Sequence, residues 1–392
     1  MLRADICVLT TPSLEVLQIK RSRGVKHYCH IVHSLTPMTY RVFGVDYFDS
    51  VLVANEIQGN FVREIEKARN IKAKYIAIVG STYLDELAKL RSLSLLRGSE
   101  ATEAIHKSKS GLPRLDCVKS RNDEVENDSR NNSVISPSLA EGDKGGGYKI
   151  PTILISPSWG KETLLSKYGI RLLEPLAKTN YHIIIRPHPQ SLISEAESSN
   201  IKTLQNALKS YENVEWDINT PNVIAFSKAD LMISDFSSVI FDFVCLEGKP
   251  VLTLDFAFDS AGYDLADIYD SSNISEFWTF KALKQIGGKI SENDFANIKD
   301  KIDSALQSSA NSANLANISK TLWQYPHNLG IKAALEILKI ERDLLQSQLD
   351  KSILNRLDLT KNAILALESH KLNIDSPKSR ESNLDSQPKK DL

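Results

Sequence analysis

The sequence is poor in cysteine and has no excess of charge of either sign. Its four cysteines are scattered, with no C-x-x-C pair and no accompanying histidines of the kind that hold zinc. A reducing cytoplasm therefore fits best. The formal net charge is −1 and no dense block of Lys and Arg is present, so the composition gives no reason to expect nucleic acid as a partner.

Long apolar runs and several catalytic signatures are also missing. No stretch of about 18 uninterrupted apolar residues occurs, and the first apolar run is too short for a signal peptide. Any association with a membrane would therefore be peripheral. The sequence contains no G-x-x-x-x-G-K-[ST] phosphate loop, no H-E-x-x-H motif and no G-x-S-x-G motif. No carboxylate cluster has the spacing of a metal site, so we predict neither a metal nor a cofactor.

What is present predicts an α/β protein with two globular domains. Hydrophobic residues make up 42% and charged residues 25% of the 392-residue chain, the balance of an ordinary soluble enzyme. From Ala4 to about Leu96, short β-rich runs alternate with a helical stretch. Residues 1–98 are therefore predicted to form an N-terminal α/β lobe.

Residues 99–149 interrupt this rhythm. They are rich in Ser, Asn, Asp, Lys and Gly and end near three successive glycines, a composition that favours a flexible linker or insertion. Residues 335–370 carry apolar residues near helical spacing, which predicts a long C-terminal helix. Residues 371–392 are polar again and are predicted to be a disordered tail.

A second α/β rhythm fills residues 150–334. Its apolar runs, from T-I-L-I to P-V-L-T-L, have the character of strands buried on both faces of a parallel sheet. The architecture predicted is two Rossmann-like lobes facing a cleft, which is GT-B-like, with ligands beyond the carboxyl ends of the strands.

The segment 229–254 contains the sharpest motif. An apolar strand stops at Ser234 and Asp235, and a helix is expected to begin near Ser237 and Ser238. The hydroxyls and free backbone N–H groups at such a helix start can hold a diphosphate. Because Ser and Asp are also the residues that cap helices, simple capping is the commoner explanation of this motif taken alone.

Arg186 and His188 end another apolar strand, in the run I-I-I-R-P-H-P, where two prolines fix the turn. Arg can bind a phosphate through two parallel hydrogen bonds, and a histidine there can stabilise or protonate a departing phosphate oxygen. Ordinary polar residues at a strand end explain the pattern equally well.

A further histidine, His33, closes a strand in the run H-I-V-H-S-L-T-P. A neutral imidazole is the usual base for an attacking hydroxyl and contributes about 10²- to 10⁴-fold in rate. His27 and His30 lie close by, and on spacing alone a surface or core histidine is the commoner outcome. It is the combination of the three motifs that favours a catalytic site.

Residues 155–259 resemble the conserved half of the CDP-glycerol glycerophosphotransferase family. The S-P-S-W run at 156–159 is similar to the family's P-[TS]-W element, and R-P-H-P at 186–189 is similar to its His-Pro element. The run S-D-F-S-S-V-I-F-D-F at 234–243, followed by Lys249-Pro250, is similar to the family's D-[YF]-S-S…F-D…[KR]-P signature. The three elements occur in the family order.

The N-terminal part resembles the family less closely. H-S-L-T-P at 33–37 is similar to the family's W-H-G-T-[PK] region, with Val32 and Ser34 in place of the usual Trp and Gly. The segment 80–85 is similar to the family's G-x-P-R-x-D run. Since family members carry further α/β units before the segment that begins here near Ala4, the first lobe, on the acceptor side, is expected to be incomplete.

The resemblance implies a transferase of teichoic-acid and cell-envelope synthesis. Such an enzyme moves glycerol phosphate, or a related polyol phosphate, from a CDP-activated donor to a hydroxyl of a membrane-linked or surface-polymer precursor and releases CMP. It would work at the cytoplasmic face of the membrane as a peripheral protein, with an oligomeric state that the resemblance leaves open.

The resemblance also implies the site residues. His33 and His188 would be catalytic, with His33 as the base. The residues implied at the donor phosphates are Ser156, Ser158, Lys161, Arg186, Asp235, Ser237, Ser238 and Asp242. Lys161 stands near the place of a common family Arg, which changes the phosphate geometry, and Asp242 would orient a donor hydroxyl or only its own helix.

Two alternatives remain open at this stage. A nucleotide-sugar-dependent glycosyltransferase of GT-B architecture would use the same diphosphate site with a different donor pocket. A non-catalytic or truncated nucleotide-binding member would fit the short first lobe and the changed surroundings of His33. Most of the tryptophans are expected to lie in the core, and these are Trp159, Trp216, Trp278 and Trp323.

Overall fold

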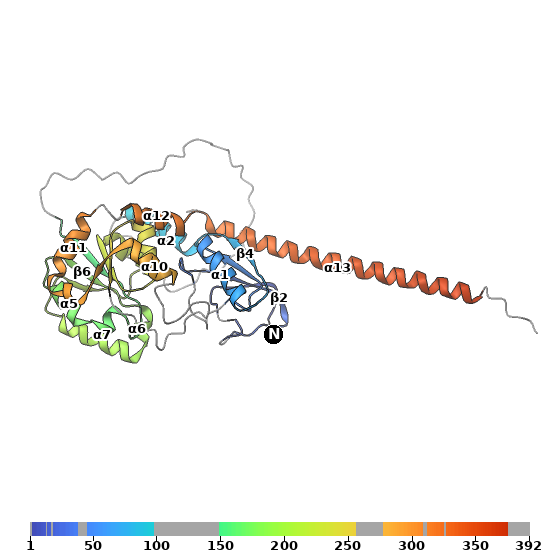
Figure 1. Cartoon of the computed structure of the whole chain (residues 1–392), viewed down its shortest axis with the longest axis horizontal. Helices are drawn as coiled ribbons and strands as arrows, with labels where there is room; N and C mark the ends of the chain where they lie inside the picture. The colour runs from blue at the N-terminus through green and yellow to red at the C-terminus, as the bar shows by residue number, and fades with distance from the viewer. Residues whose placement is uncertain are drawn as a thin grey trace, which may run out of the picture. The chain divides into compact units, whose positions relative to one another are not determined.

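The structure is a computed structural model that describes residues 2–12, 14–16, 19–37, 45–97, 149–255, 277–308, 312–324 and 327–374, the side chains of 94–97 and 368–374 excepted. The linker predicted over 99–149 therefore lies outside the described residues except for Lys149. The chain divides into a compact unit from Met1 to Ala333, which contains both sheets, and a second unit from Ala334 onward (Figure 1).

The first sheet has four parallel strands in the order β1-β2-β3-β4, which is also their order in the chain. Helix α1 begins after Asn55, whose side chain accepts the Gln58 N–H at 3.0 Å and so caps the helix. The elements are β1 Arg3–Leu9, β2 Gly24–Ile31, β3 Ser50–Val53, α1 Glu56–Ala68, β4 Tyr75–Ile78 and α2 Thr82–Arg97.

The turn between β4 and α2 allows the returning chain to come close. Gly80 has a φ of +86°, which favours glycine, and a Cβ there would lie 2.7 Å from a methyl carbon of Leu329. One turn into α2, the buried Asp85 carboxylate accepts the N–H groups of His327 and Leu329 at 2.8 and 3.3 Å. These contacts fix the segment 327–329 against the first lobe.

The second sheet has six parallel strands in the order β10-β9-β8-β5-β6-β7. The chain builds β5, β6 and β7 in one direction, returns to the other side of β5, and then builds β8, β9 and β10. This is the strand order of doubly wound dinucleotide-binding sheets, which bind ligands beyond the carboxyl ends of the strands at the point of reversal. Here the reversal lies between β5 and β8.

The strands of this sheet are short and their helices cover both faces. The strands are β5 Thr152–Ile155, β6 His182–Ile185, β7 Val214–Trp216, β8 Leu231–Ser234, β9 Val251–Leu254 and β10 Gly287–Ile290. The helices are α4 Leu164–Lys167, α5 Ile170–Ala177, α6 Pro189–Ile193, α7 Glu195–Ala207, α8 Asn222–Lys228, α9 Val239–Glu247, α10 Trp278–Ile286, the 3₁₀ helix Glu292–Asn297, α11 Ile298–Gln307 and α12 Ser312–Leu322. Strand β10 was not expected from the sequence.

Alternate residues of the central strands face two different cores. Leu154 of β5 and Met232 of β8 belong to one buried cluster, whereas Ile153 and Ile233 belong to the other. A strand whose successive side chains are all buried must be apolar at every position. This explains the uninterrupted apolar runs, and the prediction of an α/β fold with parallel sheets is confirmed.

Helix α2 joins the first sheet to the helices of the second. Its Leu84 and Leu87 belong to the same buried cluster as Phe226 of α8. Farther along α2, the guanidinium of Arg91 makes two hydrogen bonds, at 2.8 and 3.0 Å, to the Glu247 carboxylate at the end of α9. The two lobes therefore share part of one hydrophobic core.

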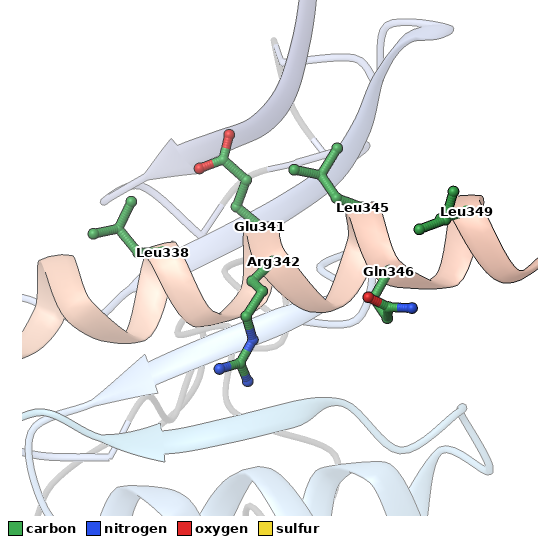
Figure 2. A pocket seen from close by; sticks show the side chains of 6 residues that line it. All are labelled: Leu338, Glu341, Arg342, Leu345, Gln346 and Leu349. Carbon is green, nitrogen blue, oxygen red and sulfur yellow. The ribbon is translucent and has the colours of Figure 1, made fainter.

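Helix α13 runs from Leu329 to Ile374, so it begins before the predicted 335–370 and extends four residues into the segment predicted to be a disordered tail. In the second unit it exposes many aliphatic side chains. Leu338, Leu345 and Leu349 are 57%, 51% and 55% exposed, and Figure 2 shows them on one side of the helix with Arg342 and Gln346 on the other. Within the described part of the chain, no helix combines the length and the apolar character needed to span a bilayer.

Candidate functional site

Asp235 is the centre of the site at the reversal of the second sheet. Its side chain is almost fully buried and accepts four backbone N–H groups, from Ser158 at 2.9 Å, Leu164 at 3.0 Å, Phe236 at 2.7 Å and Ser237 at 3.1 Å. Burial raises the pKa of Asp235, and these hydrogen bonds act in the opposite direction. The carboxylate thus faces protein backbone and holds two loops together.

The two loops held by Asp235 follow the adjacent strands β5 and β8. The Ser234 hydroxyl donates to the Ser156 carbonyl at 2.6 Å, and the Ser156 N–H donates to the Ile233 carbonyl at 3.1 Å. Ser156 is buried, while Ser158 is half-buried. The structure therefore brings the S-P-S-W and S-D-F-S-S motifs side by side, although they are about 80 residues apart in the sequence.

Helix α9 begins directly after these serines. Ser238 is its N-cap residue and lies exposed, and its hydroxyl makes no capping hydrogen bond in the described structure. Ser237 is buried with only 7% of its surface exposed. The simple capping role that was the commoner explanation is thus not performed by Ser238, and the positive end of the α9 dipole lies at this point.

His188 lies at the end of β6, next to β5 in the sheet, and is the N-cap residue of α6. Its Nδ1 accepts the backbone N–H of Gln190 at 3.1 Å, so in the neutral ring the proton is on Nε2. Burial lowers the pKa of His188, and the negative charge of Glu197 acts in the opposite direction. At neutral pH the ring can therefore donate a hydrogen bond from Nε2.

Trp159 and Lys161 continue the loop after β5. Trp159 is 50% exposed, so the expectation of a core residue is wrong for it, and its ring lies 6.3 Å from the His188 ring. Trp159 lies outside the core because it belongs to a loop at the carboxyl end of the sheet. Lys161 is exposed and lies two residues farther along this loop.

Arg186 is committed to a network within the protein. Its two terminal nitrogens donate to the Asp217 carboxylate, to the Thr220 hydroxyl at 3.1 Å, to the Thr220 carbonyl at 2.8 Å and to the Asn222 amide oxygen at 2.9 Å. Burial by itself would raise the pKa of Asp217, but hydrogen bonds from Thr220 and the Arg186 charge lower it. The terminal nitrogens have no N–H group left over for a phosphate, so Arg186 braces the ends of β6 and β7.

Asp242 lies in the first turn of α9 and is half-buried. Burial raises its pKa to about 7. Its negative charge acts on Tyr83 of α2, whose hydroxyl is hydrogen-bonded to Asn222. Asp242 thus lies within electrostatic reach of Tyr83, at the contact between α2 and the second lobe.

His33 follows β2 at the carboxyl end of the first sheet and is exposed. Its Nδ1 lies 3.2 Å from the Thr10 carbonyl oxygen, which can only accept, so Nδ1 carries the proton and Nε2 is left as a proton acceptor. The loop that follows is held by Gln58, whose amide donates to the carbonyls of Ser34 at 2.6 Å and Thr36 at 3.0 Å.

The structure separates the three neighbouring histidines. His27 hydrogen-bonds to Ser50 at 2.8 Å, and burial lowers its pKa. His30 is 1% exposed, bonds through Nδ1 to the Leu9 carbonyl at 2.9 Å, and has its pKa lowered by burial to about 4. Of the three, His33 is the one that reaches the end of the strand with an accessible ring.

The predicted residues thus include a group at the carboxyl end of the second sheet and a separate histidine in the first lobe. Hydrogen bonds join Asp235 to Ser158 and Ser237 and join Ser156 to Ser234, and a ring contact with Trp159 adds His188. In the described part of the chain, no hydrogen bond joins His33 to these residues. Sequence reasoning missed the partners of Arg186 and the contacts of Glu197, because these residues come from the turn after β7, from α8 and from α7, and no motif contains them. Among the described residues, no group of His, Cys, Asp and Glu side chains could hold a metal ion.

Comparison with known proteins bears on the same segment. Residues 101–267 match the model of the family described as CDP-Glycerol:Poly(glycerophosphate) glycerophosphotransferase, and the structure describes 149–255 of them. The Minor teichoic acid biosynthesis protein GgaB of Bacillus subtilis (strain 168) is 29% identical over 137 residues, which cover 30% of this chain and 15% of that protein. The chain thus matches only a small part of the length of this curated relative.

Solved structures of similar fold have low overall similarity. The Wall Teichoic Acid Polymerase TagF is 17% identical with a TM-score of 0.48, over 84% of this chain and 71% of that chain. The UDP-GlcNAc 2-epimerase of Methanocaldococcus jannaschii is 14% identical with a TM-score of 0.45, over 80% and 69% of the two chains. These scores carry no conclusion about chemistry.

The family match does not reach residues 28–90, so the N-terminal resemblance stays a prediction. It does include the S-P-S-W, R-P-H-P and S-D-F-S-S motifs on which the sequence resemblance depended. The resemblance is thereby confirmed over residues 101–267, which match the model of the CDP-glycerol:poly(glycerophosphate) glycerophosphotransferase family.

Proposed function

We propose that this chain transfers glycerol phosphate, or a related polyol phosphate, from a CDP-activated donor to a hydroxyl of a membrane-linked or surface-polymer precursor. Residues 150–334 would hold the donor and residues 1–98 would face the acceptor. The printed description of the family names CDP-glycerol and poly(glycerophosphate), and GgaB is named for teichoic acid synthesis. Work at the cytoplasmic face of a membrane, as a peripheral protein, is part of the proposal.

One observation carries the donor site. Asp235 holds the Ser156–Ser158 loop against the start of α9 through four backbone N–H groups, at the reversal of a doubly wound sheet. The open start of α9, with the hydroxyls of Ser237 and Ser238, is then available to the diphosphate. Asp235 and Arg186 would support this site from behind and would not bind phosphate themselves.

The proposed step forms one bond and breaks one. The acceptor oxygen attacks the β-phosphorus of the donor, the bond from that phosphorus to the bridging oxygen breaks, and CMP leaves. His33 takes the hydroxyl proton on Nε2, the atom that its bond to Thr10 leaves unprotonated. His188 donates its Nε2–H to a phosphate oxygen, where charge develops, and Lys161 supplies positive charge nearby.

The experiment is a two-part assay on the full chain. Equilibrium binding is measured with CDP-glycerol, CDP-ribitol and a UDP-sugar, and CMP release is measured with a membrane extract as the source of acceptor. We expect binding of a CDP-polyol and CMP release that depends on the extract and falls in His33→Ala and His188→Ala. Ser238→Ala should weaken donor binding by about tenfold, a loss of about 1.4 kcal/mol.

Two other results would replace the proposal. Binding of the UDP-sugar in preference to both CDP-polyols would favour a glycosyltransferase with the same diphosphate site. Tight binding of CDP-glycerol without CMP release from any extract would favour a non-catalytic nucleotide-binding member, as the altered residues beside His33 would allow.

A further inference from the structure

Glu197 joins three parts of the donor side, although no motif contains it. Its carboxylate accepts the Gly160 N–H at 3.1 Å, from the loop after β5, and the Ser191 hydroxyl at 2.7 Å, from α6. Its charge also acts on the His188 ring at the start of α6. A half-buried carboxylate with two hydrogen-bond partners on different elements fixes their spacing.

The position of Glu197 in its own helix makes these contacts possible. Glu197 is the third residue of α7, after the N-cap residue Ser194, where a Glu side chain commonly turns back to the N-cap N–H. Here the Ser194 N–H already donates to the Gln190 carbonyl at 3.0 Å. The Glu197 carboxylate is thereby released from capping its own helix and reaches across to Gly160 and Ser191.

Glu197 holds Gly160, and the preceding residue, Trp159, lies directly beside His188. Trp159 precedes Gly160, and its exposed ring lies 6.3 Å from the His188 ring with an interplanar angle of 30°. Helices α6 and α7 lie side by side (Figure 1), so a change at Glu197 acts on both the loop and the histidine. Gly160 has a φ of +107°, a conformation that glycine adopts readily and that turns its N–H toward the carboxylate.

We propose that Glu197 is a positioning residue of the donor site, which holds the Trp159 loop against α6 and keeps the His188 ring beside it in a fixed orientation and charge state. The expected effect of Glu197 on donor binding rests on the function proposed above. The effect on the His188 ring does not depend on it. Glu197 itself does not need to touch the donor.

The first test uses Trp159 as a reporter of His188. Protonated imidazole quenches indole fluorescence more strongly than neutral imidazole, so the emission lost in Trp159→Phe should titrate with His188. Two effects on the pKa of His188 act in opposition: burial of the ring lowers it, and the negative charge of Glu197 raises it. We expect Glu197→Gln to move the titration midpoint to lower pH by about half a unit or more.

Glu195→Gln is the matched control, because Glu195 opens the same helix, is exposed, and carries the same charge. It should leave the midpoint in place. Equal midpoints in the wild type, Glu197→Gln and Glu195→Gln would overturn the proposal. If Glu197→Gln lacks a cooperative thermal transition, Glu197→Asp replaces it, with a smaller shift in the same direction expected and an unchanged midpoint again counting against the proposal.

The second test is donor affinity. Glu197→Gln should weaken equilibrium binding of CDP-glycerol about tenfold, and Glu195→Gln should not weaken it; equal affinity in all three proteins would remove the donor part of the proposal. Absence of CDP-glycerol binding in the wild type would instead contradict the proposed function, while the fluorescence titration would still decide whether Glu197 acts on His188.

Discussion

The two lobes present their histidines in opposite ways. His33 and His188 each follow a buried parallel strand, but the Nδ1 of His33 donates to a backbone carbonyl, whereas the Nδ1 of His188 accepts a backbone N–H. In the neutral rings, the outward Nε2 is therefore a proton acceptor in the first lobe and a donor in the second. The backbone around each ring, and not the type of residue, therefore decides which of the two could serve as the proposed base and which as the proposed hydrogen-bond donor.

The largest expected effect comes from replacing His33 or His188 with glutamine. A Gln amide can replace the Nε2–H of His188 as a donor but cannot replace a basic Nε2. We expect His33→Gln to lose about 10²- to 10⁴-fold in kcat, as much as His33→Ala. His188→Ala should lose about 10²- to 10³-fold, and His188→Gln should recover at least about a tenth of the activity.

The measurement is CMP release at saturating CDP-glycerol for all four variants. Substantial activity in His33→Gln together with an inactive His188→Gln would reverse the assignment of acceptor and donor. Circular dichroism spectra of the four proteins serve as the control for folding.

The next largest effect concerns Asp235, which holds the loops after β5 and β8 together. Asp235→Ala would leave four backbone N–H groups without their acceptor, and we expect it to lower the free energy of unfolding by about 3–5 kcal/mol. Asp235→Asn keeps the shape and one acceptor oxygen, so its loss should be smaller. Urea unfolding followed by Trp fluorescence measures both, and a loss below about 1 kcal/mol for Asp235→Ala would mean that the two loops are held by other contacts.

In the first lobe, the residue that corresponds to Asp235 as a buried hydrogen-bonding support is Asn55, which is fully buried. It caps α1 with its oxygen and donates through Nδ2 to the carbonyls of Leu35 at 3.0 Å and Leu322 at 3.3 Å. Asn55→Ala should cost about 2 kcal/mol of unfolding free energy. Asn55→Asp keeps the cap and loses the two donated hydrogen bonds. If only Asn55→Ala lowers the free energy of unfolding, capping alone accounts for the contribution of Asn55.

The smallest effect depends on pH and concerns Asp242. Burial raises its pKa from an ordinary 3.8 to about 7, so the folded state binds a proton that the unfolded state releases. This contribution to stability is complete below about pH 4 and is lost as the pH rises to about 7. At pH 8 we expect Asp242→Asn to be more stable than the wild type by about 1–2 kcal/mol, because the carboxyl is only half-buried.

Thermal or urea unfolding at pH 5 and at pH 8 measures this difference. The two proteins should be closer in stability at pH 5 than at pH 8. An advantage for the Asn variant that is the same at both values would show that Asp242 does not titrate in this range.

The sequence by itself determined the parallel α/β fold and the three motif positions. Side chains buried on both faces must be apolar at every position, so the strands around Leu154 and Met232 are visible as uninterrupted apolar runs. The motifs at His188 and at Ser237 and Ser238 are likewise local, since each is a short run that ends a strand or opens a helix. Residues close in sequence could therefore be assigned to the same place.

Only the tertiary structure decided what each polar side chain faces. Arg186 matched a phosphate-binding pattern but donates to Asp217, Thr220 and Asn222. Trp159 is one of four tryptophans most of which were expected in the core, but it lies exposed beside His188. Glu197 belongs to no motif and yet connects the loop after β5 to helix α6. The physical reason is that a hydrogen bond depends on the direction and distance between groups from different elements, and the order of residues along one strand or helix does not record either quantity.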